Sequence, residues 1–420
     1  METIHYDICV LGLGYIGLPT ASIFATKGKK VLGVDVVERV VHTINDGRIH
    51  IEEPDLDILV KAAVQSGNLR AASAPASADV YIIAVPTPFK ATNANPRAPD
   101  LHFVESAARS IASVVPRGAL VILESTSPVG TTEKIRAWLA DELAKVRPAE
   151  AEITVASLQY VHCPERILPG QMLKELVSND RIAGGLTHEA GLRAQELYRC
   201  FCTAEIIVTE ARTAEMAKLT ENSFRDVNIA FANELSMICS RLDIDVWEVI
   251  ALANRHPRVK ILQPGPGVGG HCIAVDPWFI VDAAPDESRL IRTAREVNDH
   301  KPHFILQQVQ AACRGCEQPV IACLGLAFKA DVDDLRESPA LEITAELARS
   351  GLFQIIVVEP YILELPVALT KLPNVRLAEV EDALRLASVV VLLVNHRRFA
   401  GINRALLHGK TVIDTRGFWR

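Results

Sequence analysis

The chain has 420 residues, of which 49% are apolar and 23% are charged, and its formal net charge at pH 7 is −7. This length and composition predict a globular protein with two or three hydrophobic cores. The negative charge argues against nonspecific binding to nucleic acid or to anionic lipid. The longest apolar runs are shorter than the ~20 residues that cross a bilayer, and the first residues lack a signal-peptide pattern. We therefore expect a cytoplasmic protein that does not insert into membranes.

The nine cysteines are odd in number and follow no disulfide framework, which is typical of a protein from a reducing compartment. Two close pairs, Cys200 with Cys202 and Cys313 with Cys316, have neither the double CxxC spacing nor the nearby histidines of a structural zinc site. We expect no metal site and interpret most of these cysteines as buried thiols.

The first half of the chain alternates short β-branched runs with helical patterns, as a doubly wound α/β fold does. Buried parallel strands are predicted within residues 7–14, 29–36, 79–86 and 119–126. Ligands of such an open sheet bind beyond the carboxyl ends of the strands. The turns that follow these runs are therefore the first candidates for a ligand site.

The first run leads into a GxGxxG pattern formed by Gly12, Gly14 and Gly17. In such a turn the glycines permit a tight bend, close approach of a pyrophosphate to the backbone, and packing of the next helix on the strand. Asp35 ends the next predicted strand, where a carboxylate can bind the adenosine ribose and repel the phosphate of NADP. We therefore predict NAD, although nearby Arg39 would suit NADP. The expected NAD contacts also include Tyr15, Ile16, Pro86, Thr87 and Thr126.

The middle of the chain is predicted to be helical. Residues 213–241 contain neither proline nor glycine and show apolar residues at helical spacing, which indicates one long helix. A further helical region, 288–302, is predicted to end at Pro302. Strand-like runs resume within residues 319–328, 354–360, 387–395 and 410–417. We predict an NAD-binding domain at 1–198, a helical domain at 199–305 and a second α/β domain at 306–420.

Three segments carry candidate chemistry. Lys218 and Asn222 lie four residues apart, hence on one face of the long helix, where they could hold an oxyanion; alone, such a pair is more often a solvated lysine and a structural amide. Residues 162–170, HCPERILPG, supply Glu165, and the glycine-rich segment 265–276, GPGVGGHCIAVD, supplies a cysteine. A thiolate combined with NAD allows an alcohol to be oxidised past the aldehyde, through a thiohemiacetal and a thioester.

These motifs, together with GLGYIGLP, ESTSPVG, KLTENSFRDVNIAFANE and LGLAFKADVDDLRESPA, resemble the UDP-glucose/GDP-mannose dehydrogenase family over essentially the whole chain. The resemblance implies two Rossmann-like domains, for NAD and for the nucleotide sugar, joined by a helical middle that forms a homodimer. It also implies a four-electron oxidation of the sugar C6 alcohol to a uronate with two NAD. A nucleotide-binding regulatory protein that has lost the chemistry is the competing interpretation.

The resemblance also implies residue roles. Cys272 would be the covalent nucleophile, Lys218 and Asn222 would stabilise the oxyanion, and Asp276 with Thr126 would orient or activate water. Glu165 matches an acid–base residue of the thioester step. Arg336 would contact the cofactor, and the residues implied for the substrate, besides Glu165, Lys218 and Asn222, are Arg166, Arg225, His256, Arg258, Gly269, Lys329 and Arg416. Arg258 is implied to act across the dimer interface, and Arg416 to contact the diphosphate.

The identity of the sugar is predicted from two short patterns. Family members that act on UDP-glucose and GDP-mannose typically show Pro-Glu-Phe-Leu and Gly-Gly-Ser-Cys, whereas this chain has PERI and GGHC, with Arg166 and His271. Enzymes acting on UDP-N-acetylhexosamines share these variants. The resemblance implies UDP-N-acetyl-D-mannosamine as the substrate, for surface polysaccharide of the enterobacterial common antigen type. UDP-N-acetyl-D-glucosamine, its C2 epimer, is the alternative, followed by UDP-glucose, and His271 has no assigned role.

Overall fold

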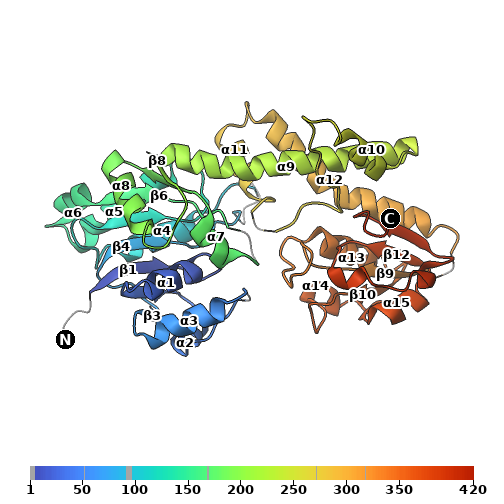
Figure 1. Cartoon of the computed structure of the whole chain (residues 1–420), viewed down its shortest axis with the longest axis horizontal. Helices are drawn as coiled ribbons and strands as arrows, with labels where there is room; N and C mark the ends of the chain where they lie inside the picture. Colours follow the sequence, from blue (N-terminus) through green and yellow to red (C-terminus); the bar gives the residue numbers. More distant parts are fainter. Residues whose placement is uncertain (1–4, 52, 91–96, 168–169, 271, 317) are drawn as a thin grey trace. The chain divides into compact units, whose positions relative to one another are not determined.

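The computed structural model describes residues 5–420 apart from 52, 91–96, 168–169, 271 and 317. His271 therefore lies outside the described residues. The chain divides into two compact units, Met1–Thr220 and Glu221–Arg420. Each unit contains a sheet flanked by helices (Figure 1).

The sheet of the first unit has eight strands in the order β3-β2-β1-β4-β5-β6-β7-β8. Its strands are β1 Tyr6–Leu11, β2 Val31–Val34, β3 Leu69–Ala72, β4 Ala78–Ile83, β5 Leu120–Leu123, β6 Gln159–His162, β7 Arg181–Gly185 and β8 Ile206–Glu210. Neighbouring strands are parallel except at the junction of β6 and β7. The carboxyl ends of β1, β2, β4 and β5 therefore meet at one edge, as a nucleotide site requires.

Helices cover both faces of this sheet. They are α1 Gly17–Thr26, α2 Glu38–Asn45, α3 Leu56–Gln65, α4 His102–Ser110, α5 Thr131–Val146, α6 Ala151–Ser157, α7 Met172–Ser178 and α8 His188–Tyr198. Alternate residues of β1 enter different cores, Ile8 on the side of Phe24 and Tyr198 and Cys9 on the side of Leu139. Strand residues buried on both faces explain the continuous apolar runs of the sequence.

The long helix is confirmed as α9 (Ala211–Leu242), with 32 residues. Its first turns are fixed to the first unit by Glu215, which is fully buried. The carboxylate of Glu215 accepts hydrogen bonds from the backbone N–H groups of Gly130 and Thr132, at 2.6 and 2.8 Å, and from the Thr132 hydroxyl at 2.7 Å. These bonds join the helix to the start of α5.

The second unit contains a five-stranded parallel sheet in the order β11-β10-β9-β12-β13. Its strands are β9 Val320–Leu324, β10 Gln354–Val358, β11 Val375–Leu377, β12 Val389–Leu392 and β13 Thr411–Asp414. The helices of this unit, besides the end of α9, are α10 Val246–Ala253, α11 Asp276–Ala283, α12 Arg289–Ala312, α13 Pro339–Arg349, α14 Val367–Thr370 and α15 Val380–Leu386, with 3₁₀ turns at Arg397–Phe399 and Arg404–Leu407. Helices α13 and α15 pack on this sheet (Figure 1).

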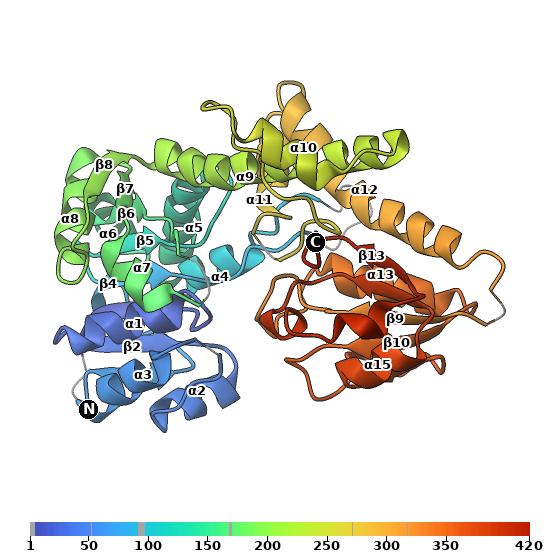
Figure 2. The ribbon, with the colours of Figure 1, turned by 45° about the vertical axis from the view of Figure 1, so that its right-hand side comes forward.

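The prediction that the helix ends at Pro302 is wrong, because α12 continues through this residue (Figure 2). A proline inside a helix lacks the N–H that would bond to the carbonyl of Asn298. The neighbouring side chains of Lys301 and Ile305 are buried. Packing of this face therefore stabilises the helix despite the missing bond, since most helical stability in proteins comes from tertiary contacts.

The two sheets repeat the same turn after their first strand. Gly12 and Gly325 have φ of 90° and 91°, and each donates its N–H, at 2.8 Å, to the carbonyl of the last residue of the neighbouring strand. The following residue then donates to an acidic side chain, Leu13 to Asp35 at 3.1 Å and Leu326 to Glu359 at 2.7 Å. With the shared strand order, this repeat confirms two Rossmann-like domains.

Candidate functional site

The glycine turn after β1 fulfils the geometric demands of a dinucleotide site. A Cβ on Gly12 would lie 2.6 Å from the carbonyl oxygen of Ala84, and a Cβ on Gly17 would lie 1.8 Å from that of Gly12. At Gly14, in contrast, a Cβ would meet no atom within 4 Å, which leaves space beside the backbone. Helix α1 begins here and its N-cap, Ile16, supplies no side-chain hydrogen bond. The start of this helix, where the positive end of its dipole lies, can therefore bind a phosphate.

The carboxylate of Asp35 stands at the carboxyl end of β2, as predicted. It accepts hydrogen bonds from the N–H groups of Leu13, at 3.1 Å, and Val37, at 2.9 Å, which orient it beside the glycine turn. Arg39 lies exposed in the first turn of α2. Thr87 donates its hydroxyl hydrogen to the carbonyl of Thr126 at 2.7 Å. This bond joins the loops after β4 and β5, so the first unit brings the predicted NAD residues to one edge of its sheet.

Glu165 is held in a buried ion pair. Its Oε2 lies 2.8 Å from Nη2 of Arg181, and both side chains are at most 6% exposed. Its other oxygen accepts the N–H of Arg166 at 2.8 Å. The guanidinium of Arg181 lies over the rings of Tyr198 and Phe201, at 4.7 and 5.3 Å from their centroids. A buried guanidinium that is stacked on two rings and paired through Nη2 holds the carboxylate in one orientation.

A second carboxyl group, Glu124, shares this cation. It accepts hydrogen bonds from the hydroxyls of Tyr198, at 2.7 Å, and Thr20, at 3.3 Å. Burial and, to a smaller extent, the negative charge of Glu165 raise the pKa of Glu124 to about 7, against the opposing effect of the Arg181 cation. One cation thus faces two carboxyl groups, and Glu124 is the one that takes up a proton near neutral pH.

Arg181 and Glu124 were not predicted from the sequence as site residues. Arg181 opens the otherwise apolar strand β7, of sequence RIAGG, and is 3% exposed. A charged residue at the start of a buried strand is a signal of an internal partner, because an unpaired charge there is costly. Nothing in the local sequence indicates that this partner is Glu165.

In the second unit, Cys272 is half-buried and precedes the first turn of α11. Its carbonyl accepts the N–H of Asp276 at 2.8 Å. The Asp276 side chain, 3% exposed, accepts a hydrogen bond from Nδ2 of Asn222 on α9. The structure therefore brings Cys272, Asp276 and Asn222 into one connected group, while Lys218 lies one helical turn before Asn222 and is half-buried.

The glycines before Cys272 are required because the loop packs closely against other atoms of the protein, independently of any ligand. A Cβ on Gly269 would lie 2.3 Å from the carbonyl oxygen of Glu337, and a Cβ on Gly267 would lie 2.9 Å from Pro339. Gly270 has φ of 81°, and its N–H donates to the carbonyl of Arg336 at 3.2 Å. We call residues 265–270 the glycine loop. It lies directly against residues 336–339, and at Gly267 and Gly269 a side chain larger than hydrogen would collide with them.

Arg416 borders the start of the glycine loop. Its Nη1 would lie 2.6 Å from a Cβ on Gly265, and its Nε donates to the carbonyl of Leu393 at 3.2 Å. Burial lowers the pKa of Arg416 to about 10, so it remains charged at neutral pH. A buried guanidinium beside a backbone without side chains is suited to a phosphate group.

The other predicted ligand residues are more exposed. Arg336 is held by Asp334, with Nη2 and Oδ2 2.6 Å apart, and Lys329 lies exposed seven residues before it. Arg258 is exposed after α10, where its N–H points to Nδ1 of His256 at 3.4 Å. Arg225 is exposed on α9, and Arg166 donates its Nη1 hydrogen to the carbonyl of Asp180 at 3.0 Å.

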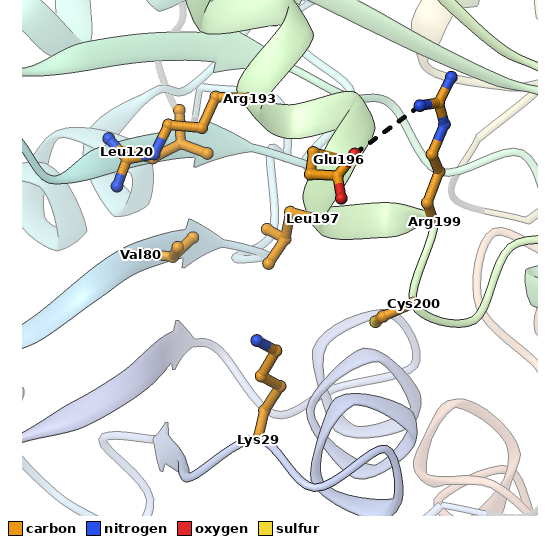
Figure 3. Close-up of a pocket in the computed structure, with 8 residues that line it drawn as sticks. All are labelled: Lys29, Val80, Leu120, Arg193, Glu196, Leu197, Arg199 and Cys200. Carbon is orange, nitrogen blue, oxygen red and sulfur yellow. Dashed lines mark ion pairs between the residues drawn. The ribbon is translucent and has the colours of Figure 1, made fainter.

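A cavity of about 450 Å³ lies elsewhere in the first unit, between α8 and the amino ends of the strands (Figure 3). Lys29, Arg193, Glu196, Arg199 and Cys200 line it, with Val80, Leu120 and Leu197. Since nucleotides bind beyond the carboxyl ends of parallel strands, this cavity is not the NAD site. In the described part of the chain, no three His, Cys, Asp or Glu side chains gather as a metal ion would require. Nor does any described helix have the length and apolarity to cross a bilayer.

Comparison with known proteins identifies the family. Models of the UDP-glucose/GDP-mannose dehydrogenase family match in three parts, the NAD binding domain at residues 6–202, the central domain at 212–300 and the UDP binding domain at 322–420. The chain belongs to this family. It is an NAD-dependent nucleotide-sugar dehydrogenase, which confirms the predicted cofactor and class of substrate.

Several similar proteins within this family carry names that specify a sugar. A Ralstonia nicotianae protein named NDP-N-acetyl-D-galactosaminuronic acid dehydrogenase is 57% identical over 98% of this chain and 96% of its own length. The UDP-N-acetyl-D-mannosamine dehydrogenase of Escherichia coli K12 is 56% identical over 98% of this chain and 99% of its own. The structure of the UDP-D-ManNAc dehydrogenase from Pyrococcus horikoshii, 38% identical, covers 99% of this chain and 96% of its own with a TM-score of 0.87.

We predict that Glu124→Gln changes the pH dependence of stability. The folded-state pKa of Glu124 is about 7, against an ordinary value of 4.5, so its favourable contribution is complete below pH ~4.5 and is lost as the pH rises through 7. The free energy of unfolding of the wild type should therefore fall more between pH 5.5 and 8 than that of the variant, as measured by urea denaturation. Glu152→Gln, at an exposed position on α6, is the control. Parallel pH profiles for wild type and Glu124→Gln would contradict the assignment.

Proposed function

We propose that the chain oxidises the C6 alcohol of UDP-N-acetyl-D-mannosamine to UDP-N-acetyl-D-mannosaminuronate with two NAD. The observation that carries this proposal is the connected group of Cys272, Asp276 and Asn222 at the start of α11. The names of the relatives at 54–57% identity support the N-acetylhexosamine class.

The proposed chemistry needs a thiol in its second half. Transfer of a hydride from C6 to the first NAD and loss of the hydroxyl proton would give an aldehyde. The sulfur of Cys272 would then add to the carbonyl carbon, and the oxygen would take up the proton that the thiol loses. The resulting thiohemiacetal loses a second hydride to the second NAD and its hydroxyl proton, leaving a thioester. Water then adds to the thioester carbon and the C–S bond breaks. This step releases the uronate carboxylate, and the sulfur of Cys272 takes up a proton to become a thiol again.

The side chains have distinct tasks in this scheme. The ammonium of Lys218 and the amide of Asn222 donate to the oxygen on C6 where negative charge develops. Asp276 accepts a hydrogen bond from Asn222 and is proposed to orient the hydrolytic water together with Thr126, as the resemblance implies. Glu165 is buried and paired with Arg181, so its carboxyl group has a fixed orientation in its proposed acid–base role.

The remaining predicted site residues are proposed to contact the substrate or the cofactor. Arg416 and Gly269 border the glycine loop, where we propose that the diphosphate binds, with Lys329 as a further contact. Arg166, Arg225, His256 and Arg258 are proposed sugar or nucleotide contacts, Arg258 from the partner subunit. Arg336 is the proposed contact to NAD. The proposed domain limits are 1–198, 199–305 and 306–420.

Two other sugars remain candidates on specific grounds. The Ralstonia relative is named for the galacto series, which makes UDP-N-acetyl-D-galactosamine the second candidate. UDP-N-acetyl-D-glucosamine differs from the proposed substrate at C2 alone. We further propose a cytoplasmic location, because free thiols such as the nine of this chain persist in reducing compartments, and a role in supplying uronate for surface polysaccharide.

We expect purified protein to form two NADH per sugar with UDP-N-acetyl-D-mannosamine. The measurement is NADH absorbance at 340 nm beside mass spectrometry of the product, with UDP-N-acetyl-D-glucosamine, UDP-N-acetyl-D-galactosamine, UDP-glucose and GDP-mannose tested in parallel. A greater kcat/KM for another sugar would replace the proposed substrate. One NADH with accumulated aldehyde would contradict the covalent route.

Cys272→Ala should abolish uronate formation and leave NAD affinity within about twofold, because the thiol is needed for chemistry and not for the dinucleotide. The matched control is Cys316→Ser, which changes an exposed cysteine far along the chain and should keep full activity. NAD binding is measured by calorimetry and the product by mass spectrometry. Undiminished uronate formation by Cys272→Ala would exclude the nucleophile assignment.

We propose that the protein is a homodimer formed through α9. Phe224, Phe231 and Ile238 are spaced seven residues apart on this helix and are 71%, 55% and 48% exposed. Large apolar side chains in one row on a helix are typical of a surface that a second helix covers. Two copies of the chain would present the same row to each other, as a twofold interface requires.

Phe231→Glu should therefore halve the mass measured by sedimentation, because two carboxylates would face each other in the proposed interface. Activity should fall with the mass, since Arg258 is proposed to act in the partner subunit. Ile58→Glu, at a position 65% exposed in the first unit, should change neither. An unchanged mass for Phe231→Glu would place the interface elsewhere.

A further inference from the structure

Four polar side chains are buried between α9 and α12 in the second unit. Asp226 and Asn233 project from α9, Arg295 and Asn298 from α12, and none is more than 1% exposed. Burying so many polar groups is costly unless they bond to one another. The catalytic scheme above uses none of them.

These side chains form one directed chain of hydrogen bonds. Arg295 Nη1 donates to Oδ1 of Asp226 at 2.6 Å, and Asn298 Nδ2 donates to the same oxygen at 2.8 Å. The Oδ1 of Asn298 accepts from Nδ2 of Asn233 at 2.8 Å. The Oδ1 of Asn233 then accepts the backbone N–H of Gly265 at 2.9 Å. An ionised carboxylate at one end and a backbone donor at the other dictate the orientation of both amides.

The last hydrogen bond of this series, from Gly265 to Asn233, fixes the first residue of the glycine loop. Gly265 is the first residue of the loop, lies beside Arg416 and precedes Cys272 by seven residues in the sequence. Four of the six loop residues are glycines, so only the buried Pro266 and the half-buried Val268 can anchor it by apolar packing. Asn233 therefore ties the loop to the same helix that carries Asn222, which bonds to Asp276 beyond Cys272. The segment from Gly265 to Asp276 is fixed to α9 near both of its ends.

We propose that Asn233 is a positioning residue for Cys272, acting through the N–H of Gly265. This inference rests on the proposed function, in which the thiol must meet the aldehyde carbon within bonding distance. Misplacement by about 1 Å can reduce a rate ~100-fold. Since the first hydride transfer needs no thiol, a displaced loop should slow the second oxidation more than the first.

The test uses the full-length protein with Asn233→Ala, Asn233→Asp and Asn298→Ala. Asn233→Ala removes the acceptor of Gly265, and Asn233→Asp keeps an acceptor but loses the donor to Asn298. Asn298→Ala leaves Asn233 in place without its orienting partner. Asn228→Ala is the control, because Asn228 lies on the same helix and bonds only to the carbonyl of Phe224 among the described interactions.

We expect Asn233→Ala to lower kcat for uronate about 10- to 100-fold with KM for NAD changed less than twofold. The NADH formed per sugar should fall from two towards one, with the aldehyde trapped by hydroxylamine. Asn233→Asp should retain more of the second oxidation than Asn233→Ala, Asn298→Ala should be intermediate, and Asn228→Ala should match the wild type. Wild-type kcat and stoichiometry in folded Asn233→Ala would overturn the proposal.

Two readouts separate this inference from the proposed function. Alkylation of Cys272 by iodoacetamide, followed by mass spectrometry, should change in rate at least several-fold in Asn233→Ala whether or not the substrate has been identified, and an unchanged rate would refute the positioning role. If the wild type forms no second NADH, the proposed function fails while the alkylation result still stands. Should the variants not fold, hydrogen exchange of the wild type decides: the Gly265 N–H should exchange as slowly as the buried core of α9, and fast exchange would refute the link.

Discussion

The close contact between the glycine loop and residues 336–339 is the constraint on which the candidate thiol site depends. Backbone meets backbone there, with the N–H of Gly270 bonded to the carbonyl of Arg336, and a Cβ at Gly269 would overlap the carbonyl of Glu337. A loop with four glycines among six residues can bury few apolar groups of its own, here Pro266 and part of Val268. Its position is set largely from outside, by Asn233 on α9 through the N–H of Gly265 and by the bond from Gly270 to the carbonyl of Arg336.

A similar dependence on distant partners holds in the first unit. Glu165 has a defined orientation because Arg181 is stacked on two aromatic rings, and Arg181 is tolerated in the core because it has carboxyl groups to face. Glu124 completes the group and adjusts its total charge by binding a proton near neutral pH. The charges beneath the loops of this sheet therefore act as one unit.

Local patterns in the sequence predicted the glycine turn, the position of Asp35 at the end of β2 and the extent of α9, because each depends on residues close together in the chain. The end of a helix at Pro302 was predicted wrongly, since burial of Lys301 and Ile305 outweighs the missing hydrogen bond. The pairing of Glu165 with Arg181 and of Asn233 with Gly265 joins residues far apart in sequence. Neither pairing leaves a periodic or compositional trace, so neither could be predicted from one sequence. The residue roles carried over by resemblance remain predictions.

The repeated turn after β1 and β9 bears on how one chain keeps two nucleotide ligands apart. At the end of β10, the oxygens of Glu359 already accept from the N–H groups of Leu326, Ala327 and Tyr361 and bond to His396. Asp35, at the matching position, has two such partners and remains half exposed. A ribose hydroxyl that donates to Glu359 would thus compete with these partners, whereas the half-exposed carboxylate of Asp35 can accept from a ribose. Saturation of the Glu359 carboxylate by partners within the protein thus disfavours a second dinucleotide site in the C-terminal domain, although the two domains share strand order and turn.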